Sequence, residues 1–238
     1  MTRPALADAF ATATGAAHRP DPITGRTGGP AGNARLTAWV GLLLLIGFIA
    51  EGVTLISVGH LITAHILIGA LLIPLVICKT ATTGWRIVRY YQGSPEYRTA
   101  GPPPLLLRVL GPLVVLTGLA VLGSGLALIA LGNATFSTIA QVAGFRIDAL
   151  TIHQASFVAW LAATALHTIG RAVPAAQVGL GAGPDGREVP GDRSRLTVVA
   201  AILVLGVATG LLTVHLSGAW TQHRIVHHDF GGHDSPGH

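Results

Sequence analysis

Two histidines, His153 and His167, lie in one apolar stretch, TIHQASFVAWLAATALHTIG, which runs from Thr151 to Gly170. In a helix their fourteen-residue spacing falls about 40° short of four full turns, so both side chains project from nearly the same face. The same spacing separates them by about 21 Å along the helix axis. An imidazole in hydrocarbon is costly unless it is paired or bound, so the pattern indicates two ligand positions at two depths.

A third histidine, His65, lies in the apolar sequence HILIGALLIP (65–74), at a depth predicted to be close to that of His153. Neutral imidazole is a common axial ligand of haem iron. Two helices that each offer a histidine at one depth can hold a haem between them, and metal binding then satisfies both rings. We therefore predict His65 and His153 as a ligand pair. The alternatives are interhelical hydrogen bonds for these two residues and interfacial exposure for His167.

Glu51 is the one acidic residue that lies clearly inside an apolar stretch. It could relay a proton or bind a quinol hydroxyl together with His60, or it could form a hydrogen bond to a neighbouring helix. Such sparse carboxylates disfavour a cation-driven transporter. The single cysteine, Cys78, excludes an internal disulfide and a cysteine-based zinc or iron–sulfur site. Small residues leave room for a flat cofactor or for close helix packing; they are Gly69, Gly118, Gly123, Ser124, Gly125, Gly206 and Gly210.

The elements that must position these residues are membrane-spanning helices. Half of the 238 residues are hydrophobic and 11% are charged, with a mean hydropathy of +0.61. Soluble domains carry about 25% charged residues, so this composition indicates an integral membrane protein. Crossing about 30 Å of hydrocarbon takes roughly 20 residues. We predict an all-α bundle of five transmembrane helices, within a domain at 36–220, over about 36–58, 61–90, 105–131, 149–172 and 195–218.

The distribution of Lys and Arg predicts the orientation of this bundle. With a cytoplasmic N-terminus, thirteen of the 15 basic residues fall on the inner side, and Arg146 and Arg224 face outward. The C-terminus is then extracytoplasmic. The net charge of +5 is interpreted as this topology signal, and no nucleic-acid partner is expected.

Two polar segments flank the predicted bundle. Residues 1–35 are rich in Gly and Pro, and we expect a disordered cytoplasmic tail rather than a signal peptide. Residues 221–238 form a His-rich extracytoplasmic tail, which could bind metal ions loosely or remain simply solvated. Its histidines are His223, His227, His228, His233 and His238.

The topology over 36–220, the HILIGALLIP sequence and the pair His153 and His167 together resemble the membrane cytochrome b subunits of the formate-dehydrogenase and nickel–iron-hydrogenase type, within the cytochrome b561-like group. The resemblance implies a bundle of four to six helices with one or two bis-histidine b haems. Two-haem members take a further histidine from the first helix, and 36–58 contains none. One b haem is therefore expected; a second haem at His167 would need an unusual ligand or one from a partner subunit.

The predicted function is that of a b-type cytochrome subunit in the bacterial cytoplasmic membrane. It would pass electrons between a redox partner subunit, such as an extracytoplasmic oxidoreductase, and membrane quinone. Because the chain has neither a dinucleotide-binding glycine motif nor a P-loop, we expect an electron-transfer subunit rather than a self-contained enzyme. The alternatives are a haem-free metal or small-molecule transporter and a structural anchor for a partner enzyme.

Overall fold

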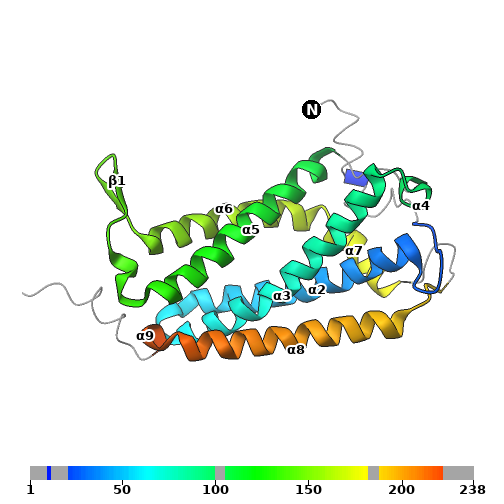
Figure 1. Cartoon of the computed structure of the whole chain (residues 1–238). Helices are drawn as coiled ribbons and strands as arrows, with labels where there is room; N and C mark the ends of the chain where they lie inside the picture. Colours follow the sequence, from blue (N-terminus) through cyan, green and yellow to red (C-terminus); the bar gives the residue numbers. More distant parts are fainter. Residues whose placement is uncertain (1–9, 12–20, 100–104, 182–187, 222–238) are drawn as a thin grey trace, which may run out of the picture.

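The computed structural model describes residues 10–11, 21–99, 105–181 and 188–221, which are mostly helical (Figure 1). The long helices are α2 (Gly29–Thr54), α3 (Val58–Tyr91), α5 (Leu105–Leu131), α6 (Ala149–Ile169) and α8 (Asp192–Leu216). The short helices are η1 (Leu55–Ser57), α4 (Pro95–Thr99), η2 (Gly132–Phe136), α7 (Ala172–Leu180) and α9 (Gly218–Thr221). One antiparallel hairpin joins β1 (Ala140–Val142) to β2 (Phe145–Ile147).

Four helical stretches of the described chain are long and apolar enough to cross a membrane: Gly29–Tyr91, Arg108–Phe136, Ala149–Ile169 and Asp192–Leu216. The first has 63 residues because α2, η1 and α3 follow one another without a break. At η1 the chain reverses, so α3 packs alongside α2 (Figure 1). The structure thus confirms a mostly helical chain with several helices of membrane-spanning length.

Most helix boundaries differ from the predicted ones by a few residues, and two of these differences change an interpretation. Helix α2 begins at Gly29 rather than near 36, because Gly28 adopts a left-handed conformation (φ 80°) and Pro30 fits the first turn. The segment 29–35 is therefore helical, contrary to the predicted disorder, while most of the tail before it lies outside the described residues. Helix α6 ends at Ile169, and α7 follows as a separate helix instead of a loop at 172. Residues 222–238 of the His-rich tail also lie outside the described residues.

Helix α3 packs closely against both α2 and α8, whereas α5 packs mainly against α6 (Figure 1). Two glycines of α8 permit the approach to α3. A Cβ on Gly206 or Gly210 would lie 2.8 Å from the carbonyl oxygen of Leu71 or Leu67, respectively. This is the close backbone contact that small residues four apart allow in membrane helices.

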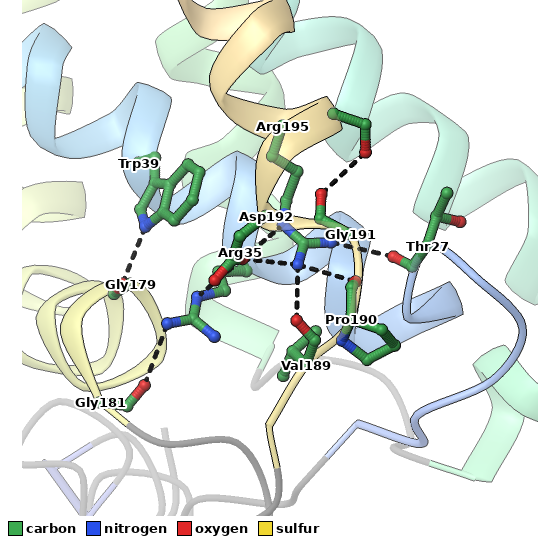
Figure 2. Close-up of polar contacts among 11 residues, drawn as sticks. Thr27, Arg35, Trp39, Gly179, Gly181, Val189, Pro190, Gly191, Asp192 and Arg195 are labelled. Atoms are coloured by element: carbon green, nitrogen blue, oxygen red, sulfur yellow. Dashed lines mark hydrogen bonds and ion pairs between the residues drawn. The ribbon is translucent and has the colours of Figure 1, made fainter.

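The start of α8 is fastened by one buried arginine, Arg195, which is 5% exposed. Its guanidinium donates to the carbonyl oxygens of Thr27, Val189 and Pro190, each at 2.9 Å, and to the carboxylate of Asp192 at 2.7 Å (Figure 2). A single side chain therefore joins the segment before α2 to the segment that leads into α8. The nitrogen atoms of the planar guanidinium thus bond to backbone carbonyl oxygens and to the carboxylate of Asp192.

Helix α7 is attached to α2 by a second set of contacts. The indole Nε1 of Trp39 donates to the carbonyl oxygen of Gly179 at 2.8 Å, and Arg35 donates to that of Gly181 at 3.4 Å (Figure 2). A Cβ on Gly179 would lie 3.3 Å from the Trp39 ring, so glycine lets the two helices approach. These bonds satisfy carbonyl groups near the end of α7 that would otherwise lack a helical partner.

Asp148 is the N-cap residue of α6, the helix that carries His153 and His167. Its carboxylate accepts hydrogen bonds from the backbone N–H and the hydroxyl of Thr151, both at 2.8 Å. The backbone bond is the main reason why the pKa of Asp148 lies below its ordinary value. Stability from this cap is therefore present above the pKa of an unfolded aspartate and is lost as the pH falls through the lower folded-state value.

We expect Asp148→Ala to lower the free energy of unfolding by about 1 kcal/mol, because the first turn of α6 loses its cap. Thermal unfolding in detergent, followed by circular dichroism, measures the change. Asp148→Asn keeps a capping oxygen without the charge and should retain most of the stability at neutral pH. If Asp148→Asn lowers the free energy of unfolding as much as Asp148→Ala does, the capping role is contradicted.

Candidate functional site

His65 of α3 and His153 of α6 lie next to each other in the structure. Their ring centroids are 6.5 Å apart and the ring planes are nearly perpendicular, at 82°. The two histidines were predicted to lie at the same depth, and in the structure their rings contact each other across two helices. Both residues are partly buried.

The hydrogen bonds around His65 fix which ring nitrogen carries the proton. Nδ1 lies 2.9 Å from the carboxylate Oε1 of Glu51 and 3.0 Å from the hydroxyl of Thr54. That hydroxyl donates its single proton to the carbonyl oxygen of Glu51 at 2.6 Å. Toward His65, both the carboxylate and the hydroxyl can therefore only accept, so Nδ1 carries the proton. In the neutral ring, Nε2 then bears a free lone pair.

The same logic applies to His153 on the other side of the pair. Its Nδ1 lies 2.9 Å from the hydroxyl of Ser124, on α5. Ser124 donates its own proton to the carbonyl oxygen of Val121 at 3.1 Å. When the hydroxyl donates to Val121, it accepts from His153, which places the ring proton on Nδ1 and the lone pair on Nε2; a hydroxyl turned toward His153 would place them the other way round. Glu51 and Thr54 thus hold His65 in the tautomer with Nε2 free, and the bond from Ser124 to Val121 favours the same tautomer in His153.

The separation of the rings fits a shared metal centre. A metal–imidazole bond is about 2 Å long, so two imidazoles on opposite sides of one metal ion have centroids about 6 Å apart. The observed 6.5 Å agrees with that value. The carboxylate of Glu51 and the two hydroxyls would then serve as outer hydrogen-bond partners that orient the ligands.

Glycines and aromatic side chains shape the surroundings of the pair. A Cβ on Gly125 would lie 3.2 Å from the His153 ring, and one on Gly69 would lie 3.2 Å from Oε1 of Glu51. Farther along α6, Trp160 packs edge-to-face on Phe48 of α2, with centroids 4.7 Å apart. The glycine at 69, predicted to make room for a cofactor, accommodates the carboxylate that holds His65.

His60, with which Glu51 could act on a quinol, is exposed at the start of α3. The carboxylate of Glu51 contacts His65 of α3, so it bonds to a neighbouring helix, which was the other interpretation. The reason is the turn at η1, which brings the end of α2 against the second turn of α3. The second carboxylate oxygen, Oε2, is buried and has no hydrogen-bond partner among the described residues.

Two functional contacts were missed by sequence reasoning. Thr54 was not singled out, and Ser124 was considered only as a small residue. Thr54 lies three residues after Glu51, so both project from neighbouring positions at the end of α2. A hydroxyl one helical turn from an intramembrane carboxylate is the signal that could have indicated it.

His167 lies apart from the pair, nearer the other end of α6. Its Nδ1 is buried and has no hydrogen-bond partner among the described residues. The charged groups that act on its ring are Arg171 and Lys79, both basic. Among the described histidines, the recorded ring contact joins His65 and His153, so the structure does not bring a second histidine to His167. His215 is exposed near the end of α8.

No family model, curated protein or solved structure matches this chain.

Proposed function

We propose that this protein is a b-type cytochrome subunit of the bacterial cytoplasmic membrane, which passes electrons between a redox partner and membrane quinone. One observation carries the proposal: the rings of His65 and His153 lie 6.5 Å apart on two helices, and the polar contacts of each ring are made through Nδ1, which leaves both Nε2 atoms available as ligands. These two residues would hold one b haem, which supplies reversible one-electron chemistry when bound. Glu51, Thr54 and Ser124 would orient the rings.

The number of protein ligands favours haem over a free metal ion. Zinc sites in proteins take three or four side-chain ligands. Among the described residues, no group of three or more His, Cys, Asp and Glu side chains could hold a metal ion. A haem needs only two axial ligands from the protein, because the porphyrin supplies four nitrogens. A pair of histidines without a third ligand is therefore suited to haem and poorly suited to transport of a bare cation.

The proposed topology has five spans, with α2 entering from the cytoplasm. Its support is the separation of charge between the two ends of the bundle. The start of α2, the end of α3, α4, α7 and the start of α8 lie together at one end, and they carry Arg35, Arg86, Arg98, Arg171 and Arg195 (Figure 1). Arg146 lies in the hairpin at the opposite end. Basic residues concentrate on the cytoplasmic side of membrane proteins, so the first end is assigned to the cytoplasm.

The absorption spectrum of the purified protein tests the function. From haem-sufficient cells we expect a Soret band and, after dithionite reduction, the sharp α band of a low-spin bis-histidine haem. A quinol analogue should reduce the same centre in reconstituted membranes. Colourless protein that is folded and monodisperse would overturn the proposal.

Glu51 should tune the reduction potential of this centre. Its carboxylate accepts from Nδ1 of His65 and so increases the electron donation of the ring, which favours the oxidised metal. Glu51→Gln retains an accepting oxygen but removes the negative charge. We expect the midpoint potential to rise by about 60 mV, which corresponds to a tenfold change in relative ligand affinity for the two oxidation states. Spectroelectrochemical titration measures the change; an unchanged potential would show that the carboxylate does not act on the ligand.

A further inference from the structure

Four basic side chains gather near the cytoplasmic end of the bundle, away from the histidine pair. This inner basic cluster consists of Lys79 and Arg86 of α3, His167 of α6, and Arg171, the N-cap residue of α7. Electrostatic interactions link His167 to Arg171 and Lys79, and link Arg171 to Arg86. Residues from three different helices therefore bring like charges to one place.

The described residues supply little negative charge to balance this cluster. Asp21 pairs with Arg86 through two bonds, at 2.8 Å and 2.5 Å. Lys79 donates to a neutral acceptor, the carbonyl oxygen of Thr37, at 2.6 Å. The side chain of Arg171 has no hydrogen bond or ion pair with a described residue. Asp21 also acts on Arg171, so a single carboxylate faces three full positive charges, beside the buried and unpartnered Nδ1 of His167.

The surroundings of the cluster favour an anion. Helix α7 begins at Ala172, directly after Arg171, and the N–H groups of its first turn carry a partial positive charge. Close like charges destabilise one another, and a bound anion removes that repulsion. The cluster lies at the membrane end that is richest in basic residues. Anionic headgroups on the cytoplasmic side are attracted to clusters of basic residues next to transmembrane helices.

We propose that the inner basic cluster binds the phosphate group of an anionic phospholipid. Lys79 and Arg171 provide the charge, and His167 provides an imidazole nitrogen at the inner side of the site. The chemistry recognised is a phosphate with a net negative charge, and its source is the lipid of the cytoplasmic leaflet. The proposal does not depend on haem binding, since none of these residues contacts His65 or His153.

Lipid retention by the full-length protein tests this proposal. The protein is reconstituted in phosphatidylcholine nanodiscs with or without phosphatidylglycerol, returned to detergent, and analysed by native mass spectrometry. We expect wild-type protein to retain phosphatidylglycerol in preference to phosphatidylcholine. In Lys79→Gln/Arg171→Gln this preference should fall at least tenfold, because two charges at the headgroup are removed.

A matched variant distinguishes a specific lipid site from general attraction between anionic lipids and the basic residues at this end of the bundle. Arg98→Gln/Arg193→Gln also removes two charges from the cytoplasmic end, but both side chains are exposed and lie outside the cluster. It should retain the lipid as wild type does. Equal loss in both double variants, or no loss in the cluster variant, would overturn the proposal. If the double cluster variant does not fold, Arg171→Gln alone gives the same test, because Arg171 is exposed and bonds to no described side chain.

Inorganic phosphate identifies the source of the anion. Because a lipid is also anchored by its acyl chains, we expect millimolar phosphate not to displace phosphatidylglycerol from wild-type protein. If free phosphate displaces the lipid, and phosphate binding depends on Lys79 and Arg171, the ligand is a soluble anion. That result would overturn the assignment to a membrane lipid.

Discussion

Alanine at either His65 or His153 is expected to abolish the Soret band of the purified protein. The two imidazoles would hold the proposed haem, and each makes its polar contacts at Nδ1. With one ring removed, the remaining histidine holds the haem from one side, and the affinity of the site falls by orders of magnitude. Absorption spectra at equal protein concentration measure the loss.

His60→Ala and His215→Ala are the matched controls for these variants. Both histidines are exposed, and they lie on α3 and α8, so they remove the same side chain without touching the pair. Both controls should retain the full spectrum. All four variants should elute as wild type does on size exclusion, which separates loss of haem from loss of fold. A normal Soret band in both His65→Ala and His153→Ala would refute the assignment of the ligands.

Arg195→Met is expected to cause the largest loss of stability of any single substitution at the end of the bundle where α2 and α8 begin. The change leaves the carbonyl oxygens of Thr27, Val189 and Pro190 without their donor, and it leaves Asp192 without its closest cation. Removal of one partner from such a buried charged network costs about 3 kcal/mol or more. Thermal unfolding in detergent should show a lower midpoint and a reduced yield of monodisperse protein.

Arg193→Met provides the comparison for Arg195, since it makes the same substitution two residues earlier on α8. Arg193 is exposed, so its loss should change the free energy of unfolding by at most about 0.5 kcal/mol. If the two variants unfold alike, the network around Arg195 does not stabilise the fold. Arg195→Lys should be intermediate, because an ammonium group cannot reach all four acceptors at once.

Hydropathy was sufficient to predict the helical regions, because a long apolar segment in a chain of few charges has few other ways to satisfy its backbone. The range 105–131 agrees with α5 residue for residue. The start of α2 was placed too late because the polar residues Asn33 and Arg35 hide a helix that begins at Gly29. Their side chains bond to the carbonyl oxygens of Thr82 and Gly181, contacts that depend on the packed structure and that hydropathy cannot show.

The candidate site was predictable to the extent that it follows from helix periodicity. Counting residues along two helices that enter from the same side placed His65 and His153 at one depth, and their rings meet. The partner of Glu51 was not predictable in this way, because it depends on the backbone of η1. A turn of three residues with a 3₁₀ conformation decides whether Glu51 faces the exposed His60 or the partly buried His65.

The turn at η1 also keeps one half of the pair within a short stretch of the chain. Glu51, Thr54 and His65 lie within fifteen residues of one another, so the first half of the site forms through local contacts as soon as α2 and α3 pair. Ser124 and His153 belong to α5 and α6, a later pair that packs mainly against itself. Each imidazole thus has its Nδ1 partners within its own helical hairpin, and the two rings meet where the hairpins dock. A ligand that bridges them binds only the docked form, so its supply would govern how much of the newly made chain reaches the mature bundle.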